Sequence, residues 1–143
     1  MLGAARELHR QLKSVEVNAA VSRSFGAGVT ILRARRAAGT LPNIVVIHLG
    51  TNGPISRRQF EQAMSVLRDV KLVVFVNVKV PRPWESFTNK TLRENVGRFP
   101  NAILIDWRAN SFERPQFFWK DSIHLRPSGA KAFVDLIVAA LGE

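Results

Sequence analysis

The residue types that could do chemistry concentrate late in the chain, at Asp121 and His124. Histidine is the usual general base for a hydroxyl nucleophile. It works best when a carboxylate holds its other ring nitrogen and stabilises the imidazolium. A spacing of three residues, on a loop just ahead of a helix, lets the carboxylate reach the ring. By itself this short pattern favours an ordinary Asp–His hydrogen bond that caps the following helix.

A second candidate is the segment Gly50-Thr51-Asn52-Gly53, which follows a run of apolar residues. A glycine-rich turn after a buried strand exposes backbone N–H groups, and Asn52 adds an amide donor. Such donors stabilise an oxyanion and are worth about 3 kcal/mol each. By itself the segment is more simply a tight turn, in which Asn and Gly accept positive φ.

A metal centre and other cofactors are not expected. His9 falls in a predicted helix and His48 in a predicted buried strand, so neither is placed to join His124 in a ligand set. The chain has no cysteine, which excludes disulfides, thiolate metal sites and cysteine nucleophiles.

The helices and strands that must position these residues are indicated by helical and strand-like sequence patterns, which alternate along the chain. The alternation predicts a parallel sheet with helices on both faces, and ligands of such sheets bind beyond the carboxyl ends of the strands. Residues 107–124 form a long connection, a kind of segment that is often functional. Helices are predicted over residues 1–12, 27–37, 56–68, 86–98 and 127–141, and strands over 15–21, 43–49, 71–78 and 101–106.

Length and composition predict one domain, residues 1–143, of which 46% are hydrophobic. No stretch approaches the ~20 apolar residues of a membrane span, so the chain as written is expected to be soluble. Its net charge of +10 suits an anionic partner such as nucleic acid, an acidic glycan or a membrane surface. Solvated helix faces explain the charge better, because the arginines are scattered and no nucleic-acid motif accompanies them.

The two candidate segments, read in order and context, resemble the SGNH, or GDSL-like, hydrolase superfamily. The stretches VSRSF, VVIHLGTNGPI, VNVKVPRPWE and DSIHLRPSGAKAF are similar to the extracytoplasmic SGNH domain that follows acyltransferase-3 membrane regions. Peptidoglycan O-acetyltransferases belong to that group. The resemblance spans Met1 to about Val138, and it implies a three-layer α/β/α flavodoxin-like fold with a parallel sheet.

The resemblance also implies roles for individual residues. Asp121 and His124 correspond to the Asp and His of the last block, the orienting carboxylate and the general base, and Asn52 to an oxyanion donor in the same block as Gly50. Ser22 corresponds to the second block, where its backbone N–H would be another oxyanion donor. Its neighbour Arg23 is read either as a binding residue or as part of a structural salt bridge.

The sequence departs from the family at the nucleophile. The family's nucleophile is the serine of a Gly-Asp-Ser at the end of the first strand, whereas this chain opens with the helix that follows. No other serine lies at a sharp strand-to-helix turn. The first strand and the nucleophile are therefore predicted to be missing, so that the chain is N-terminally truncated relative to the family. Either it is a fragment, which the otherwise intact site favours, or it is a natural non-catalytic remnant.

The implied function is that of a serine esterase or O-acyl(acetyl)transferase domain acting on ester-linked acyl groups of a cell-envelope glycan. Without the serine the chain as given is expected to be inactive. Expected partners are an acylated glycan or small acyl ester and, in a full-length protein, a membrane acyltransferase domain; no specific nucleic acid is expected. The alternative is a non-catalytic glycan- or polyanion-binding domain, supported by the positive charge and by three aromatics expected to be exposed, Phe117, Phe118 and Trp119.

Overall fold

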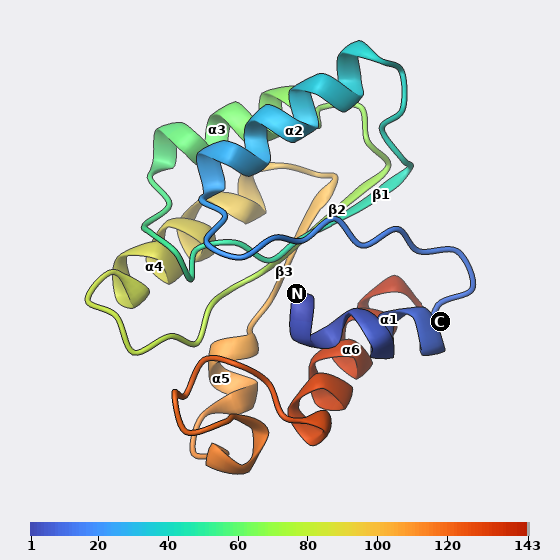
Figure 1. The fold of residues 1–143 in the computed structure, drawn as a ribbon. Coiled ribbons are helices and arrows are strands. Elements are labelled where there is room, and N and C mark those ends of the chain that lie inside the picture. Colours follow the sequence, from blue (N-terminus) through green and yellow to red (C-terminus); the bar gives the residue numbers. More distant parts are fainter. Residues whose placement is uncertain (143) are drawn as a thin grey trace.

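A computed structural model describes residues 1–142, and Figure 1 shows a parallel sheet with helices on both faces. The sheet has three strands in the order β1-β2-β3, all parallel. This three-layer α/β/α arrangement confirms the predicted fold class. The elements are η1 Leu2–Ala4, α1 Ala5–Gln11, α2 Phe25–Ala37, β1 Ile44–Ile47, α3 Arg57–Val66, β2 Leu72–Val76, α4 Glu85–Asn95, η2 Val96–Arg98, β3 Ala102–Ile105, α5 Trp107–Ser111, η3 Pro115–Phe117 and α6 Pro127–Leu141.

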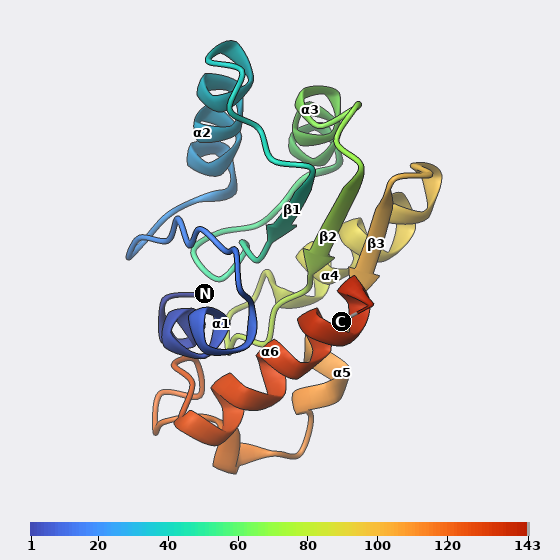
Figure 2. The same ribbon diagram turned by 90° about the vertical axis from the view of Figure 1, so that its right-hand side faces the viewer.

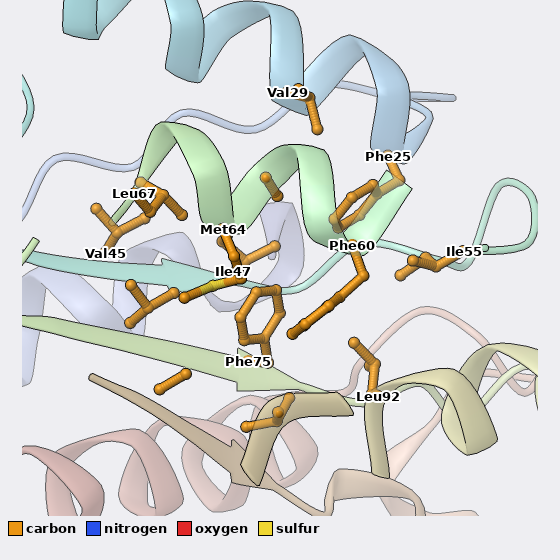
Figure 3. Close-up of a cluster of buried hydrophobic side chains, with 14 of the residues drawn as sticks. Phe25, Val29, Val45, Ile47, Ile55, Phe60, Met64, Leu67, Phe75 and Leu92 are labelled. Carbon is orange, nitrogen blue, oxygen red and sulfur yellow. The ribbon is translucent and has the colours of Figure 1, made fainter. Parts of the chain in front are cut away.

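Each face of the sheet carries its own hydrophobic core, because successive strand residues point to opposite faces. On one face, Phe75 of β2 packs with Phe60 and Met64 of α3, and the core extends to α2 and α4 (Figure 3). On the other face, Val74 and Val76 pack against α1 and α6. The central strand β2 is buried on both faces from Val73 to Val76, which explains its continuous apolar sequence.

Short-range signals set the helix starts near their predicted positions. Ser56 caps α3 in a capping box: its hydroxyl accepts from the Gln59 N–H at 3.2 Å, and its own N–H donates to Gln59 Oε1 at 3.0 Å. Pro127 opens α6, where its missing N–H costs no hydrogen bond. Ser24 caps α2 and extends this helix two residues upstream of the predicted start.

The strand predicted over residues 15–21 is wrong. Val15 and Val17 pack against the core between the sheet and α6, but the segment belongs to no strand of the sheet. A β-strand needs a backbone partner, and the only neighbour of β1 in the described sheet is β2. Figure 2 shows β1 at one edge of the sheet, with β2 between it and β3. One edge of β1 is therefore open, and Ile44 is 42% exposed.

The long connection after β3 is more ordered than predicted, since it contains α5 and η3. Asp106 caps α5 by accepting from the Ala109 N–H at 2.9 Å. Phe118 was expected to be exposed, but it is buried against Trp107, and Phe117 is half-buried beside it. Of the three aromatics expected on the surface, only Trp119 is largely exposed, at 51%.

Candidate active site

A tight hairpin between η3 and α6 carries Asp121 and His124. Phe118 and Leu125 form an antiparallel bridge, and the Trp119 N–H donates to the His124 carbonyl at 2.9 Å. The Ser122 N–H donates to the Trp119 carbonyl at 2.9 Å, and Ser122 has a φ of 60°. The turn thus reverses the chain and brings Asp121 and His124 to the same end of the hairpin.

The Asp121 carboxylate contacts His124 in two ways. Its Oδ2 pairs with the imidazole Nδ1. Its Oδ1 accepts from the backbone N–H groups of Ile123 at 2.9 Å and His124 at 3.0 Å, so that the carboxylate is held in position. With Nδ1 engaged, Nε2 is the ring nitrogen left to take a proton. The His124 side chain is 77% exposed, and substrate or a nucleophile can therefore reach this nitrogen.

The same contacts lower the pKa of Asp121 to about 2, chiefly through the hydrogen bond to His124 and then through the two backbone N–H groups. We expect a ¹³C NMR titration of the Asp121 carboxyl to show a midpoint near this value, against about 3.9 for an unperturbed aspartate. Because the pKa is depressed in the folded chain, the stabilisation is present above pH ~3.9 and lost as the pH falls toward the folded value. His124→Gln should raise the midpoint, whereas His9→Gln should leave it unchanged. A midpoint near 3.9 in the unaltered chain would contradict the observed pairing.

The turn after β1 presents Gly50 and Asn52 at the carboxyl edge of the sheet. Gly50 has a φ of 120°, and a Cβ there would lie 2.9 Å from Thr88 Cγ2, so both backbone conformation and space require glycine. Its carbonyl accepts from the Trp84 indole N–H at 3.0 Å. The exposed Asn52 makes only one long hydrogen bond, 3.3 Å to Thr51 Oγ1. Its amide N–H groups are therefore available to a ligand.

Asn89 of α4 supports the floor beneath that turn. Its side-chain amide accepts from the Val78 N–H at 2.9 Å and donates to the Val78 carbonyl at 2.8 Å. Both backbone polar groups of Val78, which follows β2, are thereby hydrogen-bonded. Val78 Cγ1 would lie 3.2 Å from a Cβ on Gly50. The buried Asn89 thus links α4 to the segment that carries Asn52.

Replacing Asn89 by leucine should lower the free energy of unfolding by about 3 kcal/mol, because two buried backbone groups lose their partner at about 1–3 kcal/mol each. Urea denaturation measures the change. The same substitution at the exposed Asn110, which also donates to a carbonyl, should cost less than about 0.5 kcal/mol. Equal effects at both positions would mean that the Asn89 hydrogen bonds do not hold this loop.

Ser22 lies in an exposed turn ahead of α2, with a φ of 57°. Arg23 makes no salt bridge with the described residues: its Nη1 donates to the Asn18 carbonyl and to Asn18 Oδ1, both at 2.8 Å. Its role as a binding residue stays a prediction. The two arginine bonds fold the chain back on itself beside Ser22. Among the described residues neither Ser22 nor Asn52 hydrogen-bonds to the Asp121–His124 pair.

His48 follows β1, and its Nε2 is buried without a hydrogen-bond partner. Burial, and then the nearby amino group of Met1, lower the pKa of His48 to about 3, and its ring packs on Phe133 with centroids 5.0 Å apart. His48 is therefore expected to be neutral near neutral pH. Within the described part of the chain no group of three or more His, Cys, Asp or Glu side chains is arranged to hold a metal ion.

Sequence reasoning missed several residues that shape this site. Arg126 is one of them: it lies two residues after His124, and its guanidinium lies over Trp119, which the sequence had already indicated as an exposed aromatic. Gly129 lets α6 approach the hairpin closely, since a Cβ there would overlap the Phe117 carbonyl oxygen. Asn89 gave no local signal, because its partner lies 11 residues away in sequence.

Comparisons with known proteins connect this geometry to one enzyme class, although no protein-family model matches the chain. OatA of Listeria monocytogenes, a peptidoglycan O-acetyltransferase, is 27% identical over 143 residues, 100% of this chain and 23% of that protein. YrhL of Bacillus subtilis, assigned to the same class, is 31% identical over 141 residues, 99% of this chain and 22% of that protein. The chain belongs to the SGNH hydrolase superfamily. The resemblance seen in the sequence is thereby confirmed.

A solved structure agrees with this SGNH assignment at the level of the fold. The C-terminal catalytic domain of peptidoglycan O-acetyltransferase A from Streptococcus pneumoniae, determined with a methylsulfonyl adduct, matches with a TM-score of 0.86 and 23% identity, covering 99% of this chain and 87% of that chain. The SGNH chain spans less than a quarter of the length of the two curated relatives above. No helix within residues 1–142 combines the length and apolar content needed to cross a membrane.

Proposed function

We propose that the chain is the extracytoplasmic acyl-transfer part of a larger protein that O-acetylates a cell-envelope glycan of the peptidoglycan type. The observation that carries the proposal is the Asp121–His124 pair, held on a rigid hairpin beside the carboxyl edge of a parallel sheet. Homology to peptidoglycan O-acetyltransferases over 99–100% of the chain supports the reaction class. A membrane acyltransferase domain in the same full-length protein is the proposed source of acyl groups.

In the proposed reaction a serine Oγ attacks the carbonyl of an acyl donor while His124 Nε2 takes the serine proton. Asp121 orients the ring and stabilises the imidazolium. The Asn52 amide and the backbone N–H groups at Gly50 and Ser22 stabilise the oxyanion. Collapse releases the donor's alcohol, which receives the proton from His124. A sugar hydroxyl, or water, then attacks the acyl-serine carbonyl and gives its proton to His124. Collapse of this second intermediate breaks the bond between the acyl carbon and serine Oγ, His124 returns the proton to Oγ, and the acylated sugar, or the free acid, is released.

We place the nucleophile on a strand that pairs with the open edge of β1. Three features support this placement: one edge of β1 is unpaired in the described sheet, His48 Nε2 after β1 has no hydrogen-bond partner in the described residues, and residues 15–21 pair with no strand of the sheet. The amino end of the chain lies close to His48, and a Cβ on Gly3 would lie 3.7 Å from Leu125 Cβ. A Gly-Asp-Ser segment joined ahead of Met1 would therefore enter next to the His124 hairpin.

Hydrolysis of p-nitrophenyl acetate tests the function. The proposal expects no turnover above background for residues 1–143 alone. The same chain extended at its N-terminus by an apolar strand ending in Gly-Asp-Ser should turn over the ester and react with methanesulfonyl fluoride, whereas Gly-Asp-Ala in the same extension should abolish both. If residues 1–143 alone hydrolysed the ester at an ordinary enzyme rate that depended on His124, the proposed origin of the nucleophile would be wrong.

A second candidate, a non-catalytic polyanion-binding domain, is favoured only by the cations near the hairpin. Lys79, Arg114 and Arg126 form no ion pair with the described residues, whereas Arg36, Arg57 and Arg98 each pair with an acidic residue. Salt-sensitive retention on a polyanion, together with no esterase activity in the extended chain, would select this candidate over acyl transfer.

A further inference from the structure

The hairpin that carries His124 has one outward face, and Trp119 lies next to His124 on it. Trp119 and His124 are joined by the backbone hydrogen bond of the small ladder, and the Arg126 N–H donates to the Phe117 carbonyl at 2.8 Å. Since neighbouring residues of a strand alternate between faces, the buried Phe118 and the half-buried Leu125 point inward. Trp119, His124 and Arg126 therefore share the exposed face.

The Arg126 guanidinium lies over the Trp119 indole. Its central carbon lies 4.6 Å from the ring centroid. A planar guanidinium carries its N–H donors at its edge, where they can bind a carboxylate bidentately. Trp119 nevertheless remains 51% exposed, which leaves much of the indole open to a ligand. The pair thus offers an apolar ring surface and a forked cationic donor side by side.

Two further cations lie over the aromatic residues that precede Trp119 in the chain. Lys79 Nζ lies 5.6 Å from the Phe118 ring centroid, and the Arg114 guanidinium lies 5.5 Å from that of Phe117. In residues 1–142 none of these three cations has an acidic partner. The nearby Asp121 already engages His124. An anionic group that approached His124 would meet unneutralised positive charge.

We propose that Trp119 and Arg126 form an acceptor subsite for a sugar residue that carries a carboxylate, directly beside His124. The inference rests on the proposed acyl-transfer function and specifies its acceptor. The indole packs on the C–H face of the pyranose ring, and the guanidinium edge pairs with the carboxylate. This contact holds the sugar while one of its hydroxyls reaches the acyl-serine. A neutral sugar gains only the stacking contact. The exposed aromatic favours a sugar over nucleic acid or a simple polyanion, which would need no pyranose platform.

Binding of defined oligosaccharides tests the subsite without any need for turnover. Isothermal titration would compare a hyaluronan tetrasaccharide, which carries glucuronate carboxylates, with the neutral chitotetraose. The unaltered chain should bind the hyaluronan fragment about tenfold more tightly. Arg126→Gln should remove this preference, and Trp119→Ala should weaken both sugars by about tenfold. Matched controls on α4, Arg93→Gln and Phe87→Ala, change an exposed arginine and an exposed aromatic away from the hairpin, and should leave both affinities unchanged.

Three results would overturn the subsite. Equal binding of the two sugars by the unaltered chain would remove the role of the carboxylate, and an undiminished preference in Arg126→Gln would remove that of Arg126. Sodium polyphosphate is the third probe, compared with the hyaluronan fragment at equal charge. If it bound as tightly as that fragment, and if Trp119→Ala did not weaken its binding, the surface would be an unspecific polyanion-binding surface. Because none of these measurements uses the nucleophile, a failure of ester hydrolysis is distinguishable from a failure of sugar binding.

Discussion

Replacing His124 by alanine in the chain extended with a Gly-Asp-Ser strand is expected to lower kcat/KM for p-nitrophenyl acetate by about 10³-fold or more. The reason is that His124 Nε2 is the only base that the hairpin offers to a serine at this edge, with Nδ1 already paired to Asp121. Without it the serine stays protonated near neutral pH. Asp121→Asn should cost about 10²- to 10⁴-fold, since the ring loses both its orientation and the charge that stabilises the imidazolium.

The matched control is His9→Ala, which removes an exposed histidine from α1 and should leave kcat/KM unchanged. Steady-state hydrolysis at several pH values measures the effect, and heteronuclear NMR spectra show that each variant is folded. A His124→Ala variant that kept more than about a tenth of the activity would show that another group acts as the base. The role of the Asp121–His124 pair would then be structural only.

Replacing Gly129 by alanine is expected to lower the free energy of unfolding by about 3 kcal/mol, at the upper end of typical overpacking effects. A Cβ at Gly129 would overlap the Phe117 carbonyl oxygen and lie 2.9 Å from Phe117 Cβ. Backbone atoms cannot rotate away as a flexible side chain can. The same carbonyl accepts the Arg126 N–H, so that the hairpin ladder must loosen when α6 moves aside. We therefore also expect His124 to lose its fixed position.

Gly26→Ala is the control, because Gly26 is likewise helical but the nearest atom to its added Cβ is 3.9 Å away. It should be neutral or stabilise the fold by up to about 1 kcal/mol, as alanine is the better helix former. Thermal and urea denaturation measure both variants, and the chemical shifts of the hairpin amides show whether the ladder persists. Similar stability of the two variants would mean that α6 does not pack closely on the Phe117 carbonyl.

Features encoded by neighbouring residues could be predicted from the sequence, because their physical causes are local. The Ser56 cap and the Pro127 start required only the first turn of each helix. Apolar runs predicted the buried strands β1 and β2 within two residues at each end. Asp121 and His124 are three residues apart, so their contact could be predicted from their spacing in the sequence.

Tertiary structure decided whatever depends on a distant partner. Residues 15–21 alternate like a strand, yet a strand exists only where another backbone supplies hydrogen bonds, and the open edge of β1 supplies none to this segment. Phe118 is buried because the hairpin folds over Trp107. Asn89 and Gly129 matter through Val78 and Phe117, which lie 11 and 12 residues away.

The sequence by itself thus determined the three strands of the sheet, the starts of α3 and α6 and the local Asp121–His124 pair, each of which depends on residues within a few positions. Only the tertiary structure decided which backbone groups are paired, which aromatics are buried and which cations lack an acidic partner. The physical reason is that pairing, burial and charge neutralisation depend on segments that the chain brings together only when the sheet and its two helix layers assemble.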